Sequence, residues 1–217
     1  MAESYILTGD EVKDWESLMF LYNSAIKEIM TKIEILKDEF EYTHHYNPIE
    51  HVTSRLKTPQ SIVRKLKKQG YETDIASMHR YLNDIAGVRI VCSFTSDIYR
   101  IADMIGSQSD IKTLLIKNYI ASPKPNGYKS YHMIVTVPVF LSDRVVETKV
   151  EIQIRTIAQD FWASLEHKIY YKMEGNCPEE IKQELTRCAE MVSDLDDRML
   201  SLNEAIRQLS EEEETVS

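Results

Sequence analysis

The sequence predicts an α/β domain, α+β-like in its layering, in which a mixed β-sheet core is flanked by long N- and C-terminal helices. Two observations favour this class. Only 6 glycines and 6 prolines occur among 217 residues, which favours long elements over a turn-rich all-β fold. The middle of the chain also mixes strand-like and helical hydrophobic periods, whereas both ends show a helical period alone.

The first expected element is a helix from Glu11 to Tyr42. Neither Gly nor Pro lies between Gly9 and Pro48, so this stretch contains no helix breaker. Its apolar residues follow one another in alternating steps of 4 and 3, the 3.5-residue period of a coiled-coil seam. They are Trp15, Met19, Tyr22, Ile26, Ile29, Ile33, Leu36 and Phe40. We therefore expect this stripe to pack against a partner helix.

A second long helix is expected after Pro178, because proline suits a first helical turn. The same steps of 4 and 3 run through it, at Ile181, Leu185, Cys188, Val192, Leu195, Met199, Leu202, Ile206 and Leu209. The two stripes could pack on each other or form an interface between subunits. The sequence leaves both arrangements open.

Four strands and several short helices are expected between the two long helices. The strands are rich in Val, Ile, Tyr and Thr and lie at Ile85–Phe94, Thr113–Ile120, Tyr131–Phe140 and Val145–Arg155. The helices are expected at Ser61–Gly70, Thr73–Tyr81, Ile98–Ile105 and Gln159–Lys172, and a loop at Ser122–Lys129. We divide the chain into an N-terminal helix (1–46), a core (47–173) and an acidic C-terminal helix and tail (174–217).

Period-2 alternation places a row of polar side chains on one face of the last strand. The row consists of Glu147, Lys149, Glu151, Gln153 and Arg155. Such a face is ordinarily solvated. Asp84, however, opens another predicted strand, which carries Arg89. If the two strands are neighbours, the carboxylates and cations together would make a metal and phosphate site.

Charge is distributed unevenly along the chain. The residues from Glu174 onward include 13 acids and 4 bases, which accounts for the net charge of -9. A shorter stretch, 55–68, contains no acid and carries the six cations Arg55, Lys57, Arg64, Lys65, Lys67 and Lys68. This run is either a solvated helix face or an anion-binding site.

The cysteines Cys92, Cys177 and Cys188 form no CxxC pair, so neither a disulfide framework nor a structural zinc site is expected. Met1 is not followed by a basic patch and an apolar run, and no stretch approaches the roughly 18 apolar residues of a membrane span. We expect a cytoplasmic protein with no membrane partner.

Four motifs resemble the synthetase domain of the RelA/SpoT family. They are Asp-Ile-Ala-Gly-Val-Arg-Ile (Asp84–Ile90), Pro-Lys-Pro-Asn-Gly-Tyr-Lys-Ser-Tyr-His (Pro123–His132), Glu-Ile-Gln-Ile-Arg-Thr (Glu151–Thr156) and Phe-Trp-Ala-Ser-Leu-Glu-His-Lys (Phe161–Lys168). Four motifs in order over Asn47–Lys172 are far more specific than one short motif. The chain resembles the free-standing small alarmone synthetases, which have a nucleotidyltransferase-like fold. It contains no His-Asp dipeptide, a feature of the family's hydrolase half, so no hydrolase activity is expected.

This resemblance implies a GTP pyrophosphokinase of stringent response signalling. Such an enzyme transfers pyrophosphate from ATP to the 3′-hydroxyl of GTP or GDP, releasing AMP and forming pppGpp or ppGpp. Asp84 and Glu151 match the catalytic acids of the family, which bind Mg²⁺ as the cofactor. Glu151 also matches the acid that takes or orients the proton of the attacking hydroxyl.

The resemblance also assigns nucleotide-binding residues. Arg55 and Arg89 match the guanidinium groups that sandwich the adenine of ATP, and Tyr128 matches the aromatic residue that stacks on guanine. The phosphate side of the ATP site comprises Lys57, Ser61, Lys65 and Lys68, and the acceptor nucleotide is surrounded by Lys124, Asn126, Lys129, His132 and Gln153. Three further residues in matched motifs, Arg155, Glu166 and His167, are explained equally well by an ion pair or a core histidine, so their roles stay open.

Two strings, Asn47–His51 and Ile169–Lys172, resemble the RelP-type synthetases more than the RelQ-type. We expect a homotetramer with the helical stripes as interfaces, and preference between GTP and GDP stays open. The alternative function is an RNA-binding module that uses the basic helix and Tyr128 as a stacking platform. Such a module has no need of Asp84 and Glu151, because carboxylates repel phosphate unless a metal lies between them.

Overall fold

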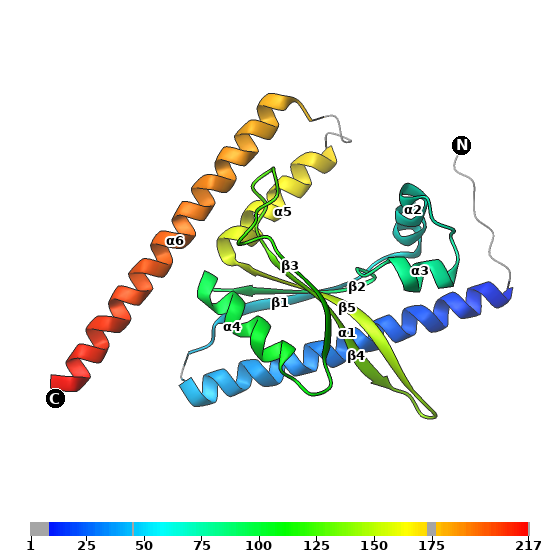
Figure 1. Cartoon of the computed structure of the whole chain (residues 1–217), viewed down its shortest axis with the longest axis horizontal. Helices are drawn as coiled ribbons and strands as arrows, with labels where there is room; N and C mark the ends of the chain where they lie inside the picture. The colour runs from blue at the N-terminus through cyan, green and yellow to red at the C-terminus, as the bar shows by residue number, and fades with distance from the viewer. Residues whose placement is uncertain (1–8, 45, 173–176, 217) are drawn as a thin grey trace.

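The computed structural model describes residues 9–44, 46–172 and 177–216, which form a five-stranded sheet with helices packed around it (Figure 1). The helices are α1 (Gly9–His44), α2 (Pro59–Gln69), α3 (Ile75–Tyr81), α4 (Thr95–Gly106), α5 (Ile157–Lys172) and α6 (Glu179–Val216). The strands are β1 (Ile49–Leu56), β2 (Ala86–Cys92), β3 (Lys112–Asn118), β4 (Tyr131–Phe140) and β5 (Val145–Thr156). None of the helices in these ranges is long and apolar enough to span a membrane.

The sheet has the strand order β1-β2-β5-β4-β3. β2 and β5 run parallel, whereas the other three neighbouring pairs are antiparallel. The predicted class, a mixed-sheet α/β domain with flanking helices, is therefore confirmed. β5 lies in the middle of the sheet, so its polar face has neighbouring strands on both sides. This face is the floor of the site described below.

The apolar stripe of α1 packs on the sheet and not on another helix, so the expectation of a partner helix was wrong for α1. α1 contacts β5, β2, β4 and β1 and crosses under the sheet (Figure 1). Its residues Tyr22, Ile29 and Ile33 are at most 2% exposed, and they share one apolar core with Ile152 and Ile154 of β5. The stripe of α1 is therefore covered by a sheet, although its 3.5-residue period predicted a partner helix.

One strand, β1, was not predicted from the sequence. Ile49 is its only buried residue, and most of its other side chains are exposed. The usual alternation of buried and exposed side chains is therefore absent. Backbone pairing with β2, from Ile49 opposite Cys92 to Leu56 opposite Ala86, holds β1 at the edge of the sheet.

The stripe of α6 is divided between a packed part and an exposed part. Near its beginning, Leu185 and Ala189 pack with Trp162 of α5, and the Trp162 Nε1 donates a hydrogen bond to the Leu185 carbonyl at 2.9 Å. Further along, Leu202 is 58% exposed and Ile206 is 63% exposed. Figure 1 shows α6 running beside α5 and then continuing beyond it. The apolar side chains of this distal part are therefore largely exposed in the described chain.

Candidate functional site

A cavity of about 610 Å³ opens on the polar face of the sheet, between β1, β2 and β5 on one side and α5 on the other. Eight of the residues singled out from the sequence line it: Arg55, Arg89, Tyr128, Glu151, Gln153, Arg155, Glu166 and His167. The rest of the lining consists of Thr53, Ser54, Gly87, Val88, Ala163, Ser164 and Lys168. The alternating pattern of β5 therefore marks a cavity floor and not a plain solvent face.

Strand register brings Arg55 and Glu151 to opposite sides of one glycine. Gly87 of β2 pairs with Arg55 of β1 and with Glu151 of β5. A Cβ added at Gly87 would lie 3.7 Å from the Arg55 carbonyl oxygen and 4.0 Å from the Glu151 carbonyl oxygen. The site therefore has an open floor at Gly87, with a cation and a carboxylate on its two sides.

Glu151 is held by two hydrogen-bonding neighbours. Its Oε1 lies 3.3 Å from the His132 Nδ1, and its Oε2 accepts a hydrogen bond from the Gln153 Nε2 at 2.9 Å. Burial alone would raise the pKa of Glu151, but these hydrogen bonds and the His132 charge outweigh burial and lower the pKa. An ionised carboxylate at this place can bind a cation or accept a proton.

Asp84 lies just before β2 and is clamped by two lysines from the acid-free run. Lys57 hydrogen-bonds its Oδ2, and the Lys65 Nζ lies 2.7 Å from the same oxygen. Burial would raise the pKa of Asp84, but the two lysines lower it. Burial lowers the pKa of Lys57, although Asp84 acts in the opposite direction. The acid-free run therefore supplies at least two partners to a half-buried acid.

The environment of Asp84 fits a divalent cation. Its Oδ1 is buried and has no hydrogen-bond partner among the residues that the structure describes. The negative charge of Asp84 acts on Glu151 and raises its pKa, so the two acids are electrostatic neighbours. Mg²⁺ in nucleotide-using sites takes one or two carboxylates and completes its shell with phosphates and water. Asp84 and Glu151 are therefore suitable magnesium ligands.

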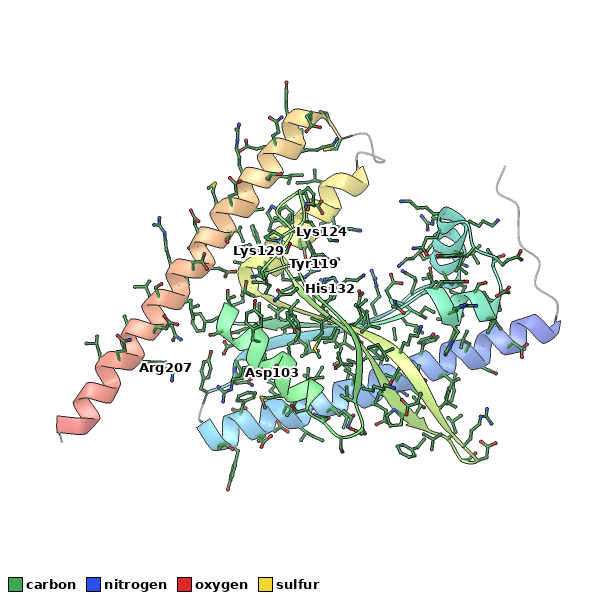
Figure 2. The ribbon with its side chains drawn as sticks, in the orientation of Figure 1. Asp103, Tyr119, Lys124, Lys129, His132 and Arg207 are labelled. Atoms are coloured by element: carbon green, nitrogen blue, oxygen red, sulfur yellow. The ribbon has the colours of Figure 1, made fainter. Side chains whose placement is uncertain are left out.

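An aromatic and cationic cluster forms the other end of the site. The Tyr128 hydroxyl lies 2.9 Å from the His132 Nε2, and the Lys124 Nζ lies 4.7 Å from the centre of the Tyr128 ring. Tyr119 meets both rings edge-on, at 5.9 Å from Tyr128 and 5.2 Å from His132. Tyr119, Lys124, Lys129 and His132 gather in one region (Figure 2). Tyr119 was not identified from the sequence, where it lies outside the matched motifs.

The loop before β4 is seated against α5 and α6. The Asn126 Nδ2 donates a hydrogen bond to the Glu166 Oε1 at 3.1 Å. Lys129 hydrogen-bonds the hydroxyl of Ser193 on α6 and does not line the cavity. Gly127 has a φ of 83°, which favours glycine. The loop thus presents Tyr128 to the cavity and Lys129 to the helix.

The predicted phosphate-side residues lie beside the cavity, on and near α2. The Thr58 side chain caps α2 by accepting from the Ser61 backbone N–H at 3.3 Å. Ser61 is half-buried, whereas Lys68 in the last turn is exposed. Neither these residues nor Lys57 and Lys65 belong to the cavity lining. Of these residues, Lys57 and Lys65 contact the acid pair, through Asp84.

Asp160, which the sequence did not assign to the nucleotide site, contacts two arginines of the cavity wall. Its Oδ1 lies 3.2 Å from the Arg89 Nη1 and 3.0 Å from the Arg155 Nη1. Burial lowers the pKa of Arg89, and the charge of Arg155 acts in the same direction while Asp160 opposes them. The Asp160 carboxylate thus forms ion pairs with two arginines of the cavity wall. Arg155, whose role the sequence left open, is both ion-paired and part of the lining.

Comparison with known proteins identifies the family of the chain. The profile described as "Region found in RelA / SpoT proteins" matches residues 54–176. The GTP pyrophosphokinase YwaC of Bacillus subtilis (strain 168) is 45% identical over 195 residues, which cover 90% of this chain and 93% of YwaC.

Two crystal structures from Bacillus subtilis are also similar. That of small alarmone synthetase 2 has a TM-score of 0.81 and 44% identity over 88% of this chain and 99% of that one. That of small alarmone synthetase 1 bound to its product pppGpp has a TM-score of 0.83 and 36% identity over 89% and 98%. The chain belongs to the RelA/SpoT family, as its motifs predicted.

Proposed function

We propose that this protein is a (p)ppGpp synthetase, a GTP pyrophosphokinase that transfers pyrophosphate from ATP to the 3′-hydroxyl of GTP or GDP. The 3′-oxygen forms a bond to the β-phosphorus of ATP, the bond from that phosphorus to the oxygen shared with the α-phosphate breaks, and AMP leaves. YwaC, a GTP pyrophosphokinase, and the synthetase 1 structure with bound pppGpp both support this reaction.

The observation that carries the proposal is that Glu151 lines the same cavity as two arginines and a tyrosine. Arg55 of β1, Arg89 of β2 and Tyr128 of the loop before β4 all line the cavity that contains Glu151. An ionised Glu151 is suited to accept the proton of an attacking hydroxyl. Stacking surfaces on both sides suit two bases at once.

Asp84 and Glu151 would hold Mg²⁺ in this site. The unpartnered Oδ1 of Asp84 supports that assignment. A bound Mg²⁺ would neutralise phosphate charge. Lys57 and Lys65, which already contact Asp84, are placed to face the same phosphates and to add positive charge beside them.

The test is to incubate the purified chain with ATP, GTP and MgCl₂ and to separate the nucleotides by anion exchange. We expect AMP and pppGpp in equal amounts. Glu151→Gln keeps the size of the side chain but removes its basicity, so the rate should fall by at least about 100-fold, the usual range for a general base. Glu147→Gln is the matched control because Glu147 occupies an exposed position on the same face of β5.

Two outcomes contradict the proposal. One is folded wild-type protein that forms no pppGpp, and the other is an unchanged rate in Glu151→Gln. The RNA-binding alternative predicts binding of single-stranded RNA that survives Asp84→Asn and Glu151→Gln, since it uses only the basic helix and Tyr128. None of the similar proteins described above supports that alternative.

The same proposal includes a RelP-type subgroup, a homotetramer and a cytoplasmic location, where both nucleotide substrates occur. The subgroup rests on the strings at Asn47–His51 and Ile169–Lys172. The tetramer is supported by the exposed apolar residues of distal α6, including Leu202 and Ile206, because a contiguous exposed apolar surface commonly marks an interface.

A further inference from the structure

A continuous chain of polar contacts joins the two walls of the cavity. The Asp160 Oδ1 lies 3.2 Å from the Arg89 Nη1 and 3.0 Å from the Arg155 Nη1. The Arg155 Nη2 in turn donates to the Tyr128 hydroxyl at 2.7 Å. The adenine-side arginine and the guanine-side tyrosine of the proposed function are therefore linked through two intervening residues.

Arg155, in the middle of this series of contacts, is buried and fully engaged. The side chain of Arg155 is 6% exposed, and besides Asp160 and Tyr128 it donates to the Ser130 Oγ at 3.3 Å and the Gln153 Oε1 at 3.0 Å. A buried guanidinium held by partners on all sides has few alternative positions. Arg89, in contrast, is 37% exposed and faces the cavity. A ligand that binds Arg89 therefore contacts a side chain that is linked, through Asp160, to a fixed guanidinium.

The start of α5 fixes Asp160 in its position. The Gln159 backbone N–H donates to the Thr156 Oγ at 3.1 Å, and the Gln159 Oε1 accepts from the Thr156 backbone N–H at 3.4 Å. This is a capping box. The Thr156 hydroxyl also donates to Asp196 of α6 at 2.6 Å. Asp160 follows in the first turn, where the helix dipole favours a carboxylate.

We propose that Asp160 is a positioning residue that couples the ATP side of the cavity to the guanine side. A nucleotide stacked on Arg89 holds this partly exposed guanidinium against the fixed Asp160, and because Asp160, Arg155 and the Tyr128 hydroxyl are joined in series, the restraint extends to the Tyr128 ring. The second nucleotide then binds to a wall that is already ordered, so each substrate raises the affinity for the other. The inference rests on the proposed function, which assigns adenine to Arg89 and guanine to Tyr128.

The test measures GDP binding by calorimetry in MgCl₂, with and without saturating AMPCPP, an ATP analogue whose α,β-bridge cannot be cleaved. In the wild-type chain we expect AMPCPP to lower the Kd of GDP by at least about fivefold, and GDP to lower the Kd of AMPCPP by the same factor, as linkage requires. A purely structural role of Asp160 would leave this coupling factor unchanged in a folded Asp160 variant.

Two variants break the chain of contacts at different points. Asp160→Asn removes the charge shared by the arginines while keeping the shape of the side chain. Tyr128→Phe keeps the stacking ring but removes the hydroxyl that Arg155 contacts, and it leaves the buried ion pair intact. In both variants we expect the coupling factor to fall below about twofold. Asp143→Asn is the matched control, because Asp143 is an exposed aspartate paired only with the adjacent Arg144 among the described contacts.

Each outcome of this experiment decides the inference. Retention of the wild-type coupling in Tyr128→Phe, or in Asp160→Asn with an unchanged Tm, would overturn it. Wild-type protein that makes pppGpp and binds both nucleotides independently would also overturn it, while leaving the proposed function intact. Wild-type protein that binds neither nucleotide and makes no pppGpp would contradict the proposed function itself, and the inference would fail with it.

Discussion

Residue 127 must lack a side chain for two separate reasons. Its φ of 83° is costly for any other residue, and an added Cβ would lie 2.4 Å from the Cβ of Ala189 on α6. Gly70, which ends α2, has a similar φ of 76° but no atom within 4 Å of the added Cβ. Substitutions at the two glycines therefore distinguish the energetic cost of a left-handed backbone from the cost of a steric clash.

We therefore predict that Gly127→Ala is more destabilising than Gly70→Ala. Gly70→Ala should lower the free energy of unfolding by about 1–2 kcal/mol, the cost of a left-handed alanine. Gly127→Ala should add about 1–3 kcal/mol for overpacking. It should also raise the KM for GTP more than that for ATP, because the displaced loop carries Tyr128. Chemical denaturation and steady-state kinetics measure both effects, and equal losses in the two variants would contradict this account.

The residues of the site differ in how far the sequence could predict them. Glu151 and Tyr128 lie in short motifs whose spacing is local, so their presence in one cavity could be expected from the resemblance. Asp160 could not be found in this way, because its role depends on two arginines from two different strands. Lys129 follows Tyr128 directly, and only the folded loop shows that it is turned toward Ser193 on α6.

At the scale of elements, α6 holds the start of α5 through a half-buried carboxylate. Asp196 accepts the hydrogen bond of Thr156, the first residue of the capping box. Burial raises the pKa of Asp196, although its hydrogen bonds with Thr156 and Gln159 act in the opposite direction. Because the folded protein holds this proton more tightly than the unfolded chain, Asp196 contributes less stability as the pH rises through its raised pKa.

We predict that Asp196→Asn is more stable than the wild type at pH 8. The neutral amide keeps an acceptor for Thr156 and avoids an ionised, half-buried carboxylate. The advantage should shrink as the pH falls toward the ordinary carboxyl range, where the wild-type Asp196 is protonated in the folded state. Urea denaturation from pH 4 to pH 8 provides the comparison. Asp194→Asn, at an exposed position on the same helix, controls for the change in net charge, and a gap that widens at low pH would refute the prediction.

Elements were predicted correctly where the hydrophobic period of the sequence determines them. The prediction failed for β1, which is determined by backbone pairing with its neighbouring strand. The four strands rich in Val, Ile and Tyr are present in the sheet. β1 is not apolar enough to be recognised, because backbone pairing with β2 and not side-chain burial makes it a strand. The stripe of α1 was predicted correctly as buried, but its partner was not, because a helix surface and a sheet surface both cover such a stripe.

At the scale of the whole molecule, the distal part of α6 presents exposed apolar side chains. Leu202 and Ile206 are more than half exposed. We predict that Leu202→Glu dissociates the proposed homotetramer, because a carboxylate would be buried without a partner in the interface. Size-exclusion chromatography with light scattering at micromolar concentration measures the mass. Gln208→Glu adds the same charge at an exposed polar position and should leave the mass unchanged. A wild-type mass of one chain would contradict the tetramer.

α6 also contacts the parts of the chain that form the site. Ala189 lies against the loop that carries Tyr128, and Asp196 holds the start of α5, while the exposed residues follow a few turns later on the same continuous helix. Self-association through that distal surface would therefore restrain the helix on which the guanine wall rests. Turnover per chain should then depend on dilution, and fall when the protein is assayed below the concentration at which its subunits separate.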